Sequence, residues 1–349
     1  MKKSVAWLGL DCHSRQCVLA HLDDEGRQVS CRSIPTEPQA LIAAVKAIPG
    51  DCKRLMLEEC EISRWIARIL RPFVEVLVVC DPRENHLLSR HHNKRDDRDA
   101  YTLARLLRLG EYKAIWQPCE SRRVAFRHAT DSYEDAVRHQ TRLKLQIKSE
   151  YRQWGVFLQG QEVFNKDKKA RFLDQLPSEA RRPVELLHEL LASALGVQRL
   201  ALSHLRQMGR EFPEISRLRK IPGIGWIGAS LFVAYVQDPK RFSSDAQLHR
   251  YCRLAIRDTS SDDKPLGYQR LDRSGHGTLK AISYRAWMTA IRRRQGPVWE
   301  FYQESLKRTG NPVHGRLNTQ RKVLTTMRRL WLNQQEFDAQ RFLRLPPSA

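Results

Sequence analysis

Four acidic residues in this chain, Asp11, Glu58, Asp96 and Asp99, have the types and the spacing of a metal site. Asp11 and Glu58 each end a short apolar run of the kind that forms a buried strand. Asp96 and Asp99 are three residues apart at the head of a helical pattern, which places them on one helix face. Such carboxylates can hold a pair of divalent cations, and a cation pair supports phosphodiester chemistry.

The charge of the chain indicates where that phosphodiester would come from. The 349 residues include 61 Lys and Arg against 39 Asp and Glu, a formal net charge of +22. The excess is +3 over residues 1–110, +12 over residues 221–349 and +7 between them. A surface this basic favours a polyanion through counterion release, so we expect a nucleic acid, and a solvated basic surface without a ligand is the alternative.

Composition narrows the class of protein. Hydrophobic residues make up 41% and charged residues 29%, which suits a globular protein. The eight cysteines include no Cys-x-x-Cys pair and are expected to be reduced thiols in a cytosol. The apolar run after Met1 is too short for a signal peptide, and no stretch reaches membrane-spanning length. We therefore expect a cytoplasmic, nucleoid-associated protein.

The elements that must position the acidic residues can be predicted from periodicity. Strands are expected at 4–11, 16–22, 28–34, 54–58 and 74–80, and helices at 36–48, with Thr36 as N-cap, and 63–71. Three antiparallel strands followed by alternating helix and strand is the order of a ribonuclease-H-like fold. In that fold the first and fourth strands lie side by side, which would bring Asp11 and Glu58 together.

The helix predicted from Asp96 has an apolar face behind its two carboxylates, formed by Ala100, Leu103, Ala104, Leu106 and Leu107. Two carboxylates this close repel unless a cation or a basic side chain lies between them. The alternative is an acidic first turn stabilised by the helix dipole. Together with Asp11 and Glu58 at strand ends, the pattern favours metal.

The central region reads as two long helices, about 124–157 and 183–208. The second carries an apolar stripe at 3/4 spacing: Val184, Leu187, Leu191, Ala194, Ala201, Leu205 and Met208. A stripe of this kind is typical of a coiled-coil seam that would join two copies of the chain. An intramolecular helical hairpin is the alternative.

The last region contains two motifs that could act on phosphate. Ile221-Pro222-Gly223-Ile224-Gly225 before an apolar helix is similar to a helix-hairpin-helix turn, whose N–H groups can bind phosphate, or it is a turn that allows close packing. Ser260 and Ser261 lie on a predicted loop flanked by arginines. A serine can attack phosphorus when cations stabilise the oxyanion, although most such pairs are ordinary loop or cap residues.

With these motifs in place, the chain resembles a DEDD transposase of the insertion-sequence family IS one-ten, in its IS eleven-eleven branch, whose relatives include the pilin-gene invertase. Its matching segments are Gly9-Leu10-Asp11, Leu57-Glu58-Glu59-Cys60, Asn93-Lys94-x-Asp96-x-x-Asp99-Ala100, Ile221 to Gly225, and Arg241-Phe242. Ser261 falls on the family's nucleophilic serine. Arg253, Ile256 and Asp262 depart from the usual Gly, Pro and Gly, so the choice of Ser261 over Ser260 rests on register.

The resemblance implies an α/β plus α architecture in three domains. Residues 1–115 would form a ribonuclease-H/RuvC-like domain that binds two Mg²⁺ ions, replaceable by Mn²⁺, through Asp11, Glu58, Asp96 and Asp99. Residues 116–215 would form a helical coiled-coil region for dimerisation. Residues 216–349 would form a mainly helical transposase domain with the serine and the helix-hairpin-helix-like turn. The protein would be a dimer or tetramer of identical chains.

The resemblance also implies a reaction. The serine would attack DNA and leave a transient phosphoserine link, and strand exchange would rejoin donor and target. A structured noncoding RNA, called a bridge RNA, would pair with both donor and target DNA. The protein would then bind the nucleic-acid backbone, and base pairing with the RNA would determine the sequence.

Other readings of the sequence remain open. They are a site-specific DNA invertase with the same residues, a Holliday-junction-type nuclease without serine chemistry, and a non-catalytic scaffold that binds nucleic acid. For all of them, the residues expected to contact nucleic acid are Lys94, Gly223, Gly225, Arg257, Arg270, Arg273, His276 and Lys280.

Overall fold

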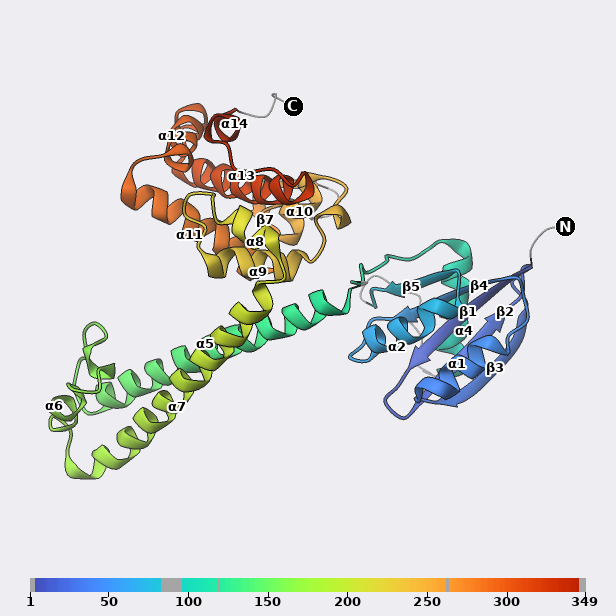
Figure 1. Ribbon diagram of the computed structural model, residues 1–349, viewed down its shortest axis with the longest axis horizontal. Helices are drawn as coiled ribbons and strands as arrows, with labels where there is room; N and C mark the ends of the chain where they lie inside the picture. The colour runs from blue at the N-terminus through green and yellow to red at the C-terminus, as the bar shows by residue number, and fades with distance from the viewer. Residues whose placement is uncertain (1–3, 83–95, 119, 262–263, 345–349) are drawn as a thin grey trace. The chain divides into compact units, whose positions relative to one another are not determined.

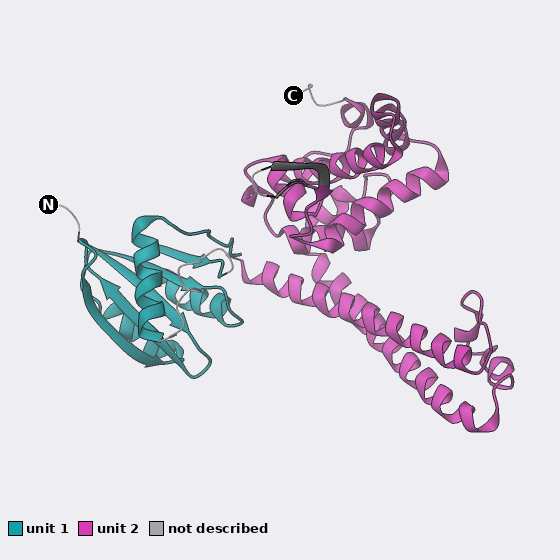
Figure 2. Cartoon of the chain, turned by 180° about the vertical axis from the view of Figure 1, so that it is seen from behind, with its two compact units in different colours: residues 1–119 teal, residues 120–349 magenta. Residues whose placement is uncertain are grey.

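The computed structural model describes residues 4–82, 96–118, 120–261 and 264–344, and over 258–269 it describes the backbone alone. The chain divides into two compact units, residues 1–119 and 120–349 (Figure 2). None of the described helices is both long and apolar enough to cross a membrane.

Unit 1 is built on a five-stranded sheet with the order β3-β2-β1-β4-β5 (Figure 1). Its strands are β1 (Val5–Cys12), β2 (Gln16–Leu22), β3 (Gln28–Pro35), β4 (Cys52–Glu58) and β5 (Val76–Cys80). The strands β1, β2 and β3 pair antiparallel, whereas β1 pairs with β4 in parallel. The prediction that the first and fourth strands are neighbours is therefore confirmed.

The two faces of this sheet are covered by different helices, which are α1 (Pro38–Lys46), α2 (Ser63–Leu70), the 3-10 turn η1 (Arg71–Phe73) and α4 (Asp96–Leu109). Leu8 and Leu10 of β1 share one core with α1 and α2. Met56 of β4 shares another core with Leu103 and Leu107 of α4. Because side chains alternate along a strand, Asp11 and Glu58 have the parity of the face that α4 covers.

Gly9 explains how closely α4 approaches the sheet. A Cβ atom added at Gly9 would lie 1.9 Å from the carbonyl oxygen of Ala100 and 2.6 Å from the backbone nitrogen of Ala104. Only a residue without a side chain leaves room for this helix, since backbone atoms cannot move aside as a flexible side chain could. The same approach brings the N-terminal turn of α4 towards the end of β1, where Asp11 lies.

Thr36 is not the N-cap that the sequence predicted. The cap of α1 is Glu37, and Pro38 occupies the first helical position, as expected for a helix-starting proline. The Thr36 hydroxyl instead donates to the carbonyl oxygen of His13 at 2.7 Å. It therefore ties the loop after β1 to the end of β3 rather than capping a helix.

Unit 2 begins with a helical hairpin of α5 (Ser121–Gln153) and α7 (Ser178–Gly209), which run side by side (Figure 1). The turn η2 (Glu162–Phe164) and α6 (Lys169–Leu173) lie at its far end. Val184 and Leu191 of the predicted seam are buried in one core with Ile147 and Tyr151 of α5. The seam thus packs within the chain, as the alternative reading expected.

The rest of unit 2 is mainly helical. Its elements are α8 (Pro213–Leu218), α9 (Trp226–Val236), η3 (Pro239–Arg241), α10 (Asp245–Tyr251), β6 (Ile256–Ser261), β7 (Lys264–Leu271), α11 (Gly277–Arg293), α12 (Pro297–Thr309), α13 (Pro312–Leu332) and α14 (Ala339–Leu343). The apolar helix α9 lies at the centre of a core that also takes in Phe126 and Leu205 from the base of the hairpin. The division of residues 116–349 into two domains stays an expectation.

The segment with the two serines is a strand rather than the loop that the sequence predicted. Ser260 and Ser261 end β6, which pairs antiparallel with β7, and Ser261 lies opposite Lys264. The register shifts between Asp258 and Ser260. The segment is rich in polar and charged residues, so it lacks the apolar alternation by which a strand is recognised in a sequence.

Candidate functional site

The acidic site of unit 1 centres on Asp11, His13 and Asp96. Nε2 of His13 lies 3.1 Å from Oδ2 of Asp11 and 3.8 Å from Oδ1 of Asp96. One ligand atom from each of the three residues lies within 4.8 Å of the others. The end of β1 and the first turn of α4 therefore converge on a volume that a single cation could fill.

The electrostatics of this site favour a cation. Burial raises the pKa of the Asp11 carboxyl, His13 acts in the opposite direction, and the negative charges of Asp96 and Asp99 add to the rise. The Asp11 side chain is 16% exposed, whereas Asp96 is 62% exposed. A half-enclosed group of carboxylates repels itself, and a divalent cation would remove that repulsion.

The positions of Glu58 and Asp99 relative to Asp11 follow from strand pairing and from electrostatics. Leu10 of β1 lies opposite Leu57 of β4, so Asp11 and Glu58 are the next positions along two parallel, hydrogen-bonded strands. Asp99 is half-buried in the first turn of α4 and is close enough to act electrostatically on Asp11. All four predicted carboxylates thus lie at one end of the β1–β4 pair or on the helix that covers it, and Asp11 and Asp96 are in the three-residue cluster.

His13 is the residue of this site that sequence reasoning missed. It stands two positions after Asp11, and residues two apart along an extended chain point to the same side. That spacing was the available signal. An imidazole beside two carboxylates either shares a metal with them or donates a hydrogen bond that orients Asp11, which is a common arrangement around bound metal ions.

The residues present suit a hard divalent cation. Carboxylate oxygens are the ligands that Mg²⁺ and Mn²⁺ prefer, and Mn²⁺ also accepts a neighbouring imidazole nitrogen. The ligand atoms of the cluster found among the described residues are carboxylate oxygens and an imidazole nitrogen, not thiols. The candidate ligands are therefore the four predicted carboxylates, Asp11, Glu58, Asp96 and Asp99, together with His13.

The β6–β7 ribbon carries the predicted nucleophile and two of the predicted phosphate contacts. Arg257 and Arg270 are exposed and lie directly opposite each other across the ribbon. Like charges in directly opposed positions destabilise a strand pair, and a bound phosphate would offset that repulsion. Ser260 and Ser261 follow on the same strand, but their side chains lie outside the described part of the structure.

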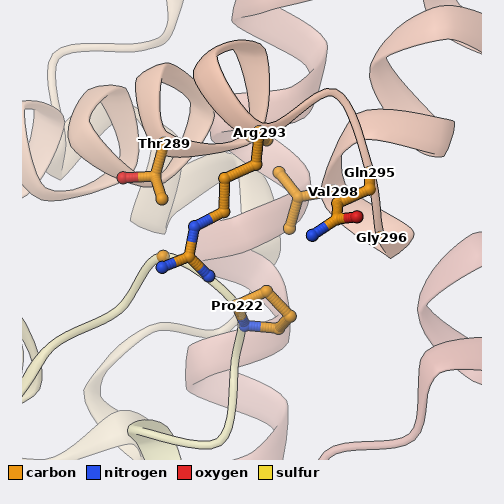
Figure 3. Close-up of a pocket in the computed structure, with 8 residues that line it drawn as sticks. Pro222, Thr289, Arg293, Gln295, Gly296 and Val298 are labelled. Carbon is orange, nitrogen blue, oxygen red and sulfur yellow. The ribbon is translucent and has the colours of Figure 1, made fainter.

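The Gly223 turn packs tightly against α11. A Cβ added at Gly223, where φ is +85°, would lie 2.8 Å from Cα of Ala286, whereas Gly225 has open space around it. Next to this turn is a cavity of about 310 Å³, into which Arg293 extends from α11 towards Pro222 (Figure 3). Gly223 thus has a packing role, and Gly225, as N-cap of α9, keeps its backbone accessible.

The other predicted contacts differ in their surroundings. Arg273 is exposed and Lys280 is half-buried, where burial lowers the pKa of its ammonium group. His276 packs against Tyr235 with ring centroids 3.8 Å apart, and burial lowers its pKa to about 4. A neutral, stacked imidazole is poorly suited to attract phosphate. Lys94 lies outside the described residues.

Two family models match the chain. A transposase model of the IS110 DEDD type matches residues 8–153, and one described as the transposase IS116/IS110/IS902 family matches residues 215–303. No curated protein matches. The four carboxylates fall within the first match, and the Gly223 turn and Ser261 fall within the second. The matches imply an enzyme that cleaves and rejoins DNA in transposition. The chain therefore belongs to the IS110 family of DEDD transposases.

Proposed function

We propose that this transposase cuts and rejoins DNA with divalent cations held by Asp11, Glu58, Asp96 and Asp99 and with Ser261 as nucleophile. The observation that carries the proposal is the convergence of Asp11, His13 and Asp96 within 4.8 Å at the end of the central strand. When bound, Mg²⁺ supplies Lewis-acid stabilisation of the phosphate oxygens. His13 keeps Asp11 oriented towards the same volume.

The chemical step is a phosphoryl transfer to serine. The Ser261 oxygen loses its proton and forms a bond to phosphorus, while a P–O bond to deoxyribose breaks and the departing oxygen takes up a proton. In the second half, a deoxyribose hydroxyl of another strand attacks the phosphoserine and releases the serine hydroxyl. Arg257 and Arg270 would hold the phosphate beside the strand that carries the nucleophile.

We propose that target choice comes from base pairing with a structured noncoding RNA of the element. The support is the net charge of +22 combined with only 8% aromatic residues, which suits a protein that grips backbones more than one that stacks on bases. Protein contacts would then fix register, and the RNA would supply the sequence.

We propose further that the chain works as an oligomer joined through α7. Apart from the stripe buried against α5, this helix exposes four large apolar side chains, Leu186, Leu190, Val197 and Leu200, at 44–72%. Their spacings of four, seven and three residues follow a heptad pattern. A polar substitution such as Leu190→Glu with Leu200→Glu should lower the oligomeric mass in multi-angle light scattering.

Matched variants test the chemistry. Ser261→Ala and Asp11→Asn should each abolish strand joining on DNA supplied with the element's RNA, while Ser260→Ala and Asp97→Asn retain it. Denaturing gels and peptide mass spectrometry should find DNA covalently attached to Ser261 and lost in Ser261→Ala. An adduct on Ser260 would move the nucleophile by one residue. Cleavage that persists in Ser261→Ala would favour a metal-dependent nuclease without serine chemistry.

A mixing experiment separates action within one chain from action between chains. Asp11→Asn lacks a carboxylate of unit 1, and Ser261→Ala lacks the hydroxyl of unit 2. If the two groups act on one phosphate from different copies, a mixture of the inactive variants regains part of the strand-joining activity. If they act within one copy, the mixture stays inactive.

A further inference from the structure

A strongly basic cavity lies in the C-terminal helices of unit 2, and its lining, among the residues that the structure describes, includes none of those that the sequence assigned to nucleic acid. It measures about 420 Å³ and is lined by residues of α10, α12, α13 and α14 and by Arg344. Six of its lining residues are cationic: Arg308, Arg321, Lys322, Arg329, Arg341 and Arg344. We call these residues and the space between them the basic pocket.

The cations occupy two levels of the pocket. Arg308, Arg329, Arg341 and Arg344 are exposed and form its rim. Arg321 is half-buried and donates through both Nε and Nη2 to the carbonyl oxygen of Leu254, at 2.9 and 2.8 Å. These contacts fix the guanidinium in place without neutralising it, because the acceptor carries no net charge.

Lys322 is the second inner cation. Its Nζ donates to the carbonyl oxygen of Arg344 at 2.8 Å and lies 5.5 Å from the ring centroid of Phe301. Burial lowers the pKa of Lys322, and the charge of Arg329 lowers it further. The folded protein therefore holds two partly desolvated positive charges next to four exposed ones.

Negative charge in the pocket is scarce. Among the described residues that line it, Asp245 is the single carboxylate, and it is engaged by Nη1 of Arg328 at 3.2 Å and Nη2 of Arg329 at 2.7 Å. Six cations around one occupied carboxylate repel one another, so an anionic ligand would relieve a strain that the fold otherwise bears.

The inner surface also offers neutral groups that suit more than a bare phosphate. Asn318 is half-buried, and Thr325 bonds through Oγ1 with Nε2 of His249 at 3.0 Å. The buried ring of Phe301 contributes apolar surface. A volume of this size is typical of pockets for small organic groups, and the smooth backbone of a paired duplex would not enter it.

We propose that the basic pocket takes one unpaired nucleotide of a nucleic-acid strand, with the flanking phosphates held at the rim. The proposal rests on the proposed function only in naming nucleic acid as the partner. It adds a contact that single residues in the sequence could not indicate, because the lining is assembled from segments between residues 245 and 344. The shared chemistry is the nucleotide, whether in DNA or RNA.

The test compares two triple variants of the full-length chain, both carrying Asp11→Asn so that no strand is cut. The pocket variant is Arg308→Gln, Arg341→Gln and Arg344→Gln. The control is Arg199→Gln, Arg219→Gln and Arg292→Gln, which removes the same charge from exposed positions outside the pocket. Circular dichroism confirms that both are folded. Fluorescence anisotropy then follows binding to a blunt duplex, to that duplex with a short oligothymidine tail, and to an oligouridine-tailed equivalent.

The pocket variant should lose about tenfold or more in affinity for a tailed duplex, with a log–log salt slope smaller by about 2, and change little for the blunt duplex. The control should affect tailed and blunt duplexes alike. A loss confined to the uridine tail assigns the pocket to RNA, and a loss confined to the thymidine tail assigns it to DNA. Equal losses for tailed and blunt duplexes, or no difference between the two triples, would overturn the proposal. Since no cleavage is measured, this outcome is independent of the Ser261 tests.

Discussion

The two units concentrate charge of opposite sign by different means. In unit 1, the end of the central strand and one helix turn bring Asp11 and Asp96 together, beside His13. In unit 2, helices distant in sequence surround a cavity with six cations and one carboxylate. In each site the like charges repel one another, and a ligand of opposite charge would relieve that repulsion. This ligand would be a cation at the carboxylates and a phosphate at the arginines. The comparison favours metal binding at the acidic site of unit 1 and phosphate binding at the basic pocket of unit 2, the unit that also carries the proposed nucleophile on β6.

The comparison extends to the glycines that let the helices approach. Gly9 admits α4 against β1, and Gly223 admits α11 against the turn before α9. The close packing of α4 on β1 positions the acidic residues of unit 1. The close packing of α11 on the Gly223 turn stabilises the basic helical part of unit 2. Substituting each glycine asks whether the two regions depend on close packing to the same degree.

Gly9→Ala should have the largest effect. The new Cβ would meet backbone atoms of α4 at 1.9 and 2.6 Å, so α4 must move and Asp96 must leave Asp11. We expect a loss of about 4 kcal/mol or more in the unfolding free energy of unit 1, and loss of metal binding. Urea unfolding measures the first, with Gly196→Ala, which meets no atom within 4 Å, as the control. Full stability in Gly9→Ala would contradict the packing described here.

Gly223→Ala should have an intermediate effect. Its Cβ would contact the backbone of Ala286 at 2.8 Å, and φ of +85° is unfavourable for alanine. We expect unit 2 to lose about 2 to 4 kcal/mol, while Gly225→Ala, which has open space, stays within about 1 kcal/mol. Thermal unfolding compares the two. If Gly223→Ala weakened DNA binding and left stability unchanged, the turn would be a phosphate site rather than a packing contact.

The smallest expected effect concerns pH and His276. In the unfolded chain this histidine takes up a proton near 6.5, whereas in the fold its pKa is about 4 because of burial and the nearby Arg127. As pH falls from 6.5 towards 4, the unfolded chain binds the proton first, so the folded state loses stability. The side chain is partly exposed, so we expect this loss to be about 1–2 kcal/mol.

His276→Gln should remove that part of the acid-induced loss and leave the rest. Chemical unfolding at pH 7 and pH 4.5, in the variant and in the parent, measures the difference. His188, whose pKa is also lowered to about 4 by burial, is present in both proteins, so the comparison isolates His276. An identical pH dependence in the two proteins would mean that His276 is not buried as the structure places it.

Much of unit 1 could be predicted from the sequence because its strands other than β3 each bury several apolar side chains. The apolar runs that end at Asp11 and Glu58 predicted two strands. The order of the elements along the chain then predicted that these strands are neighbours, as they are. The apolar face of α4 was predicted residue by residue and is buried. These signals are local, and the burial of one face enforces them.

What sequence could not give depends on contacts between distant residues. Thr36, for example, donates a hydrogen bond to the carbonyl oxygen of His13, 23 residues away, instead of capping α1. The β6–β7 segment consists largely of polar residues without apolar alternation, so its sequence resembled a loop. The basic pocket draws on α10, α12, α13 and α14, and no window of sequence contains enough of it to be recognised.

The most direct test of the account is a titration with Mn²⁺, followed by electron paramagnetic resonance and calorimetry. The unmodified chain should bind Mn²⁺ saturably, and Mg²⁺ should compete. Asp11→Asn, Glu58→Gln, Asp96→Asn and Asp99→Asn should each weaken binding by at least about tenfold, while the neighbouring Asp97→Asn binds as the parent does. Equal binding by Asp97→Asn and Asp11→Asn would contradict the claim that these four carboxylates form the metal centre.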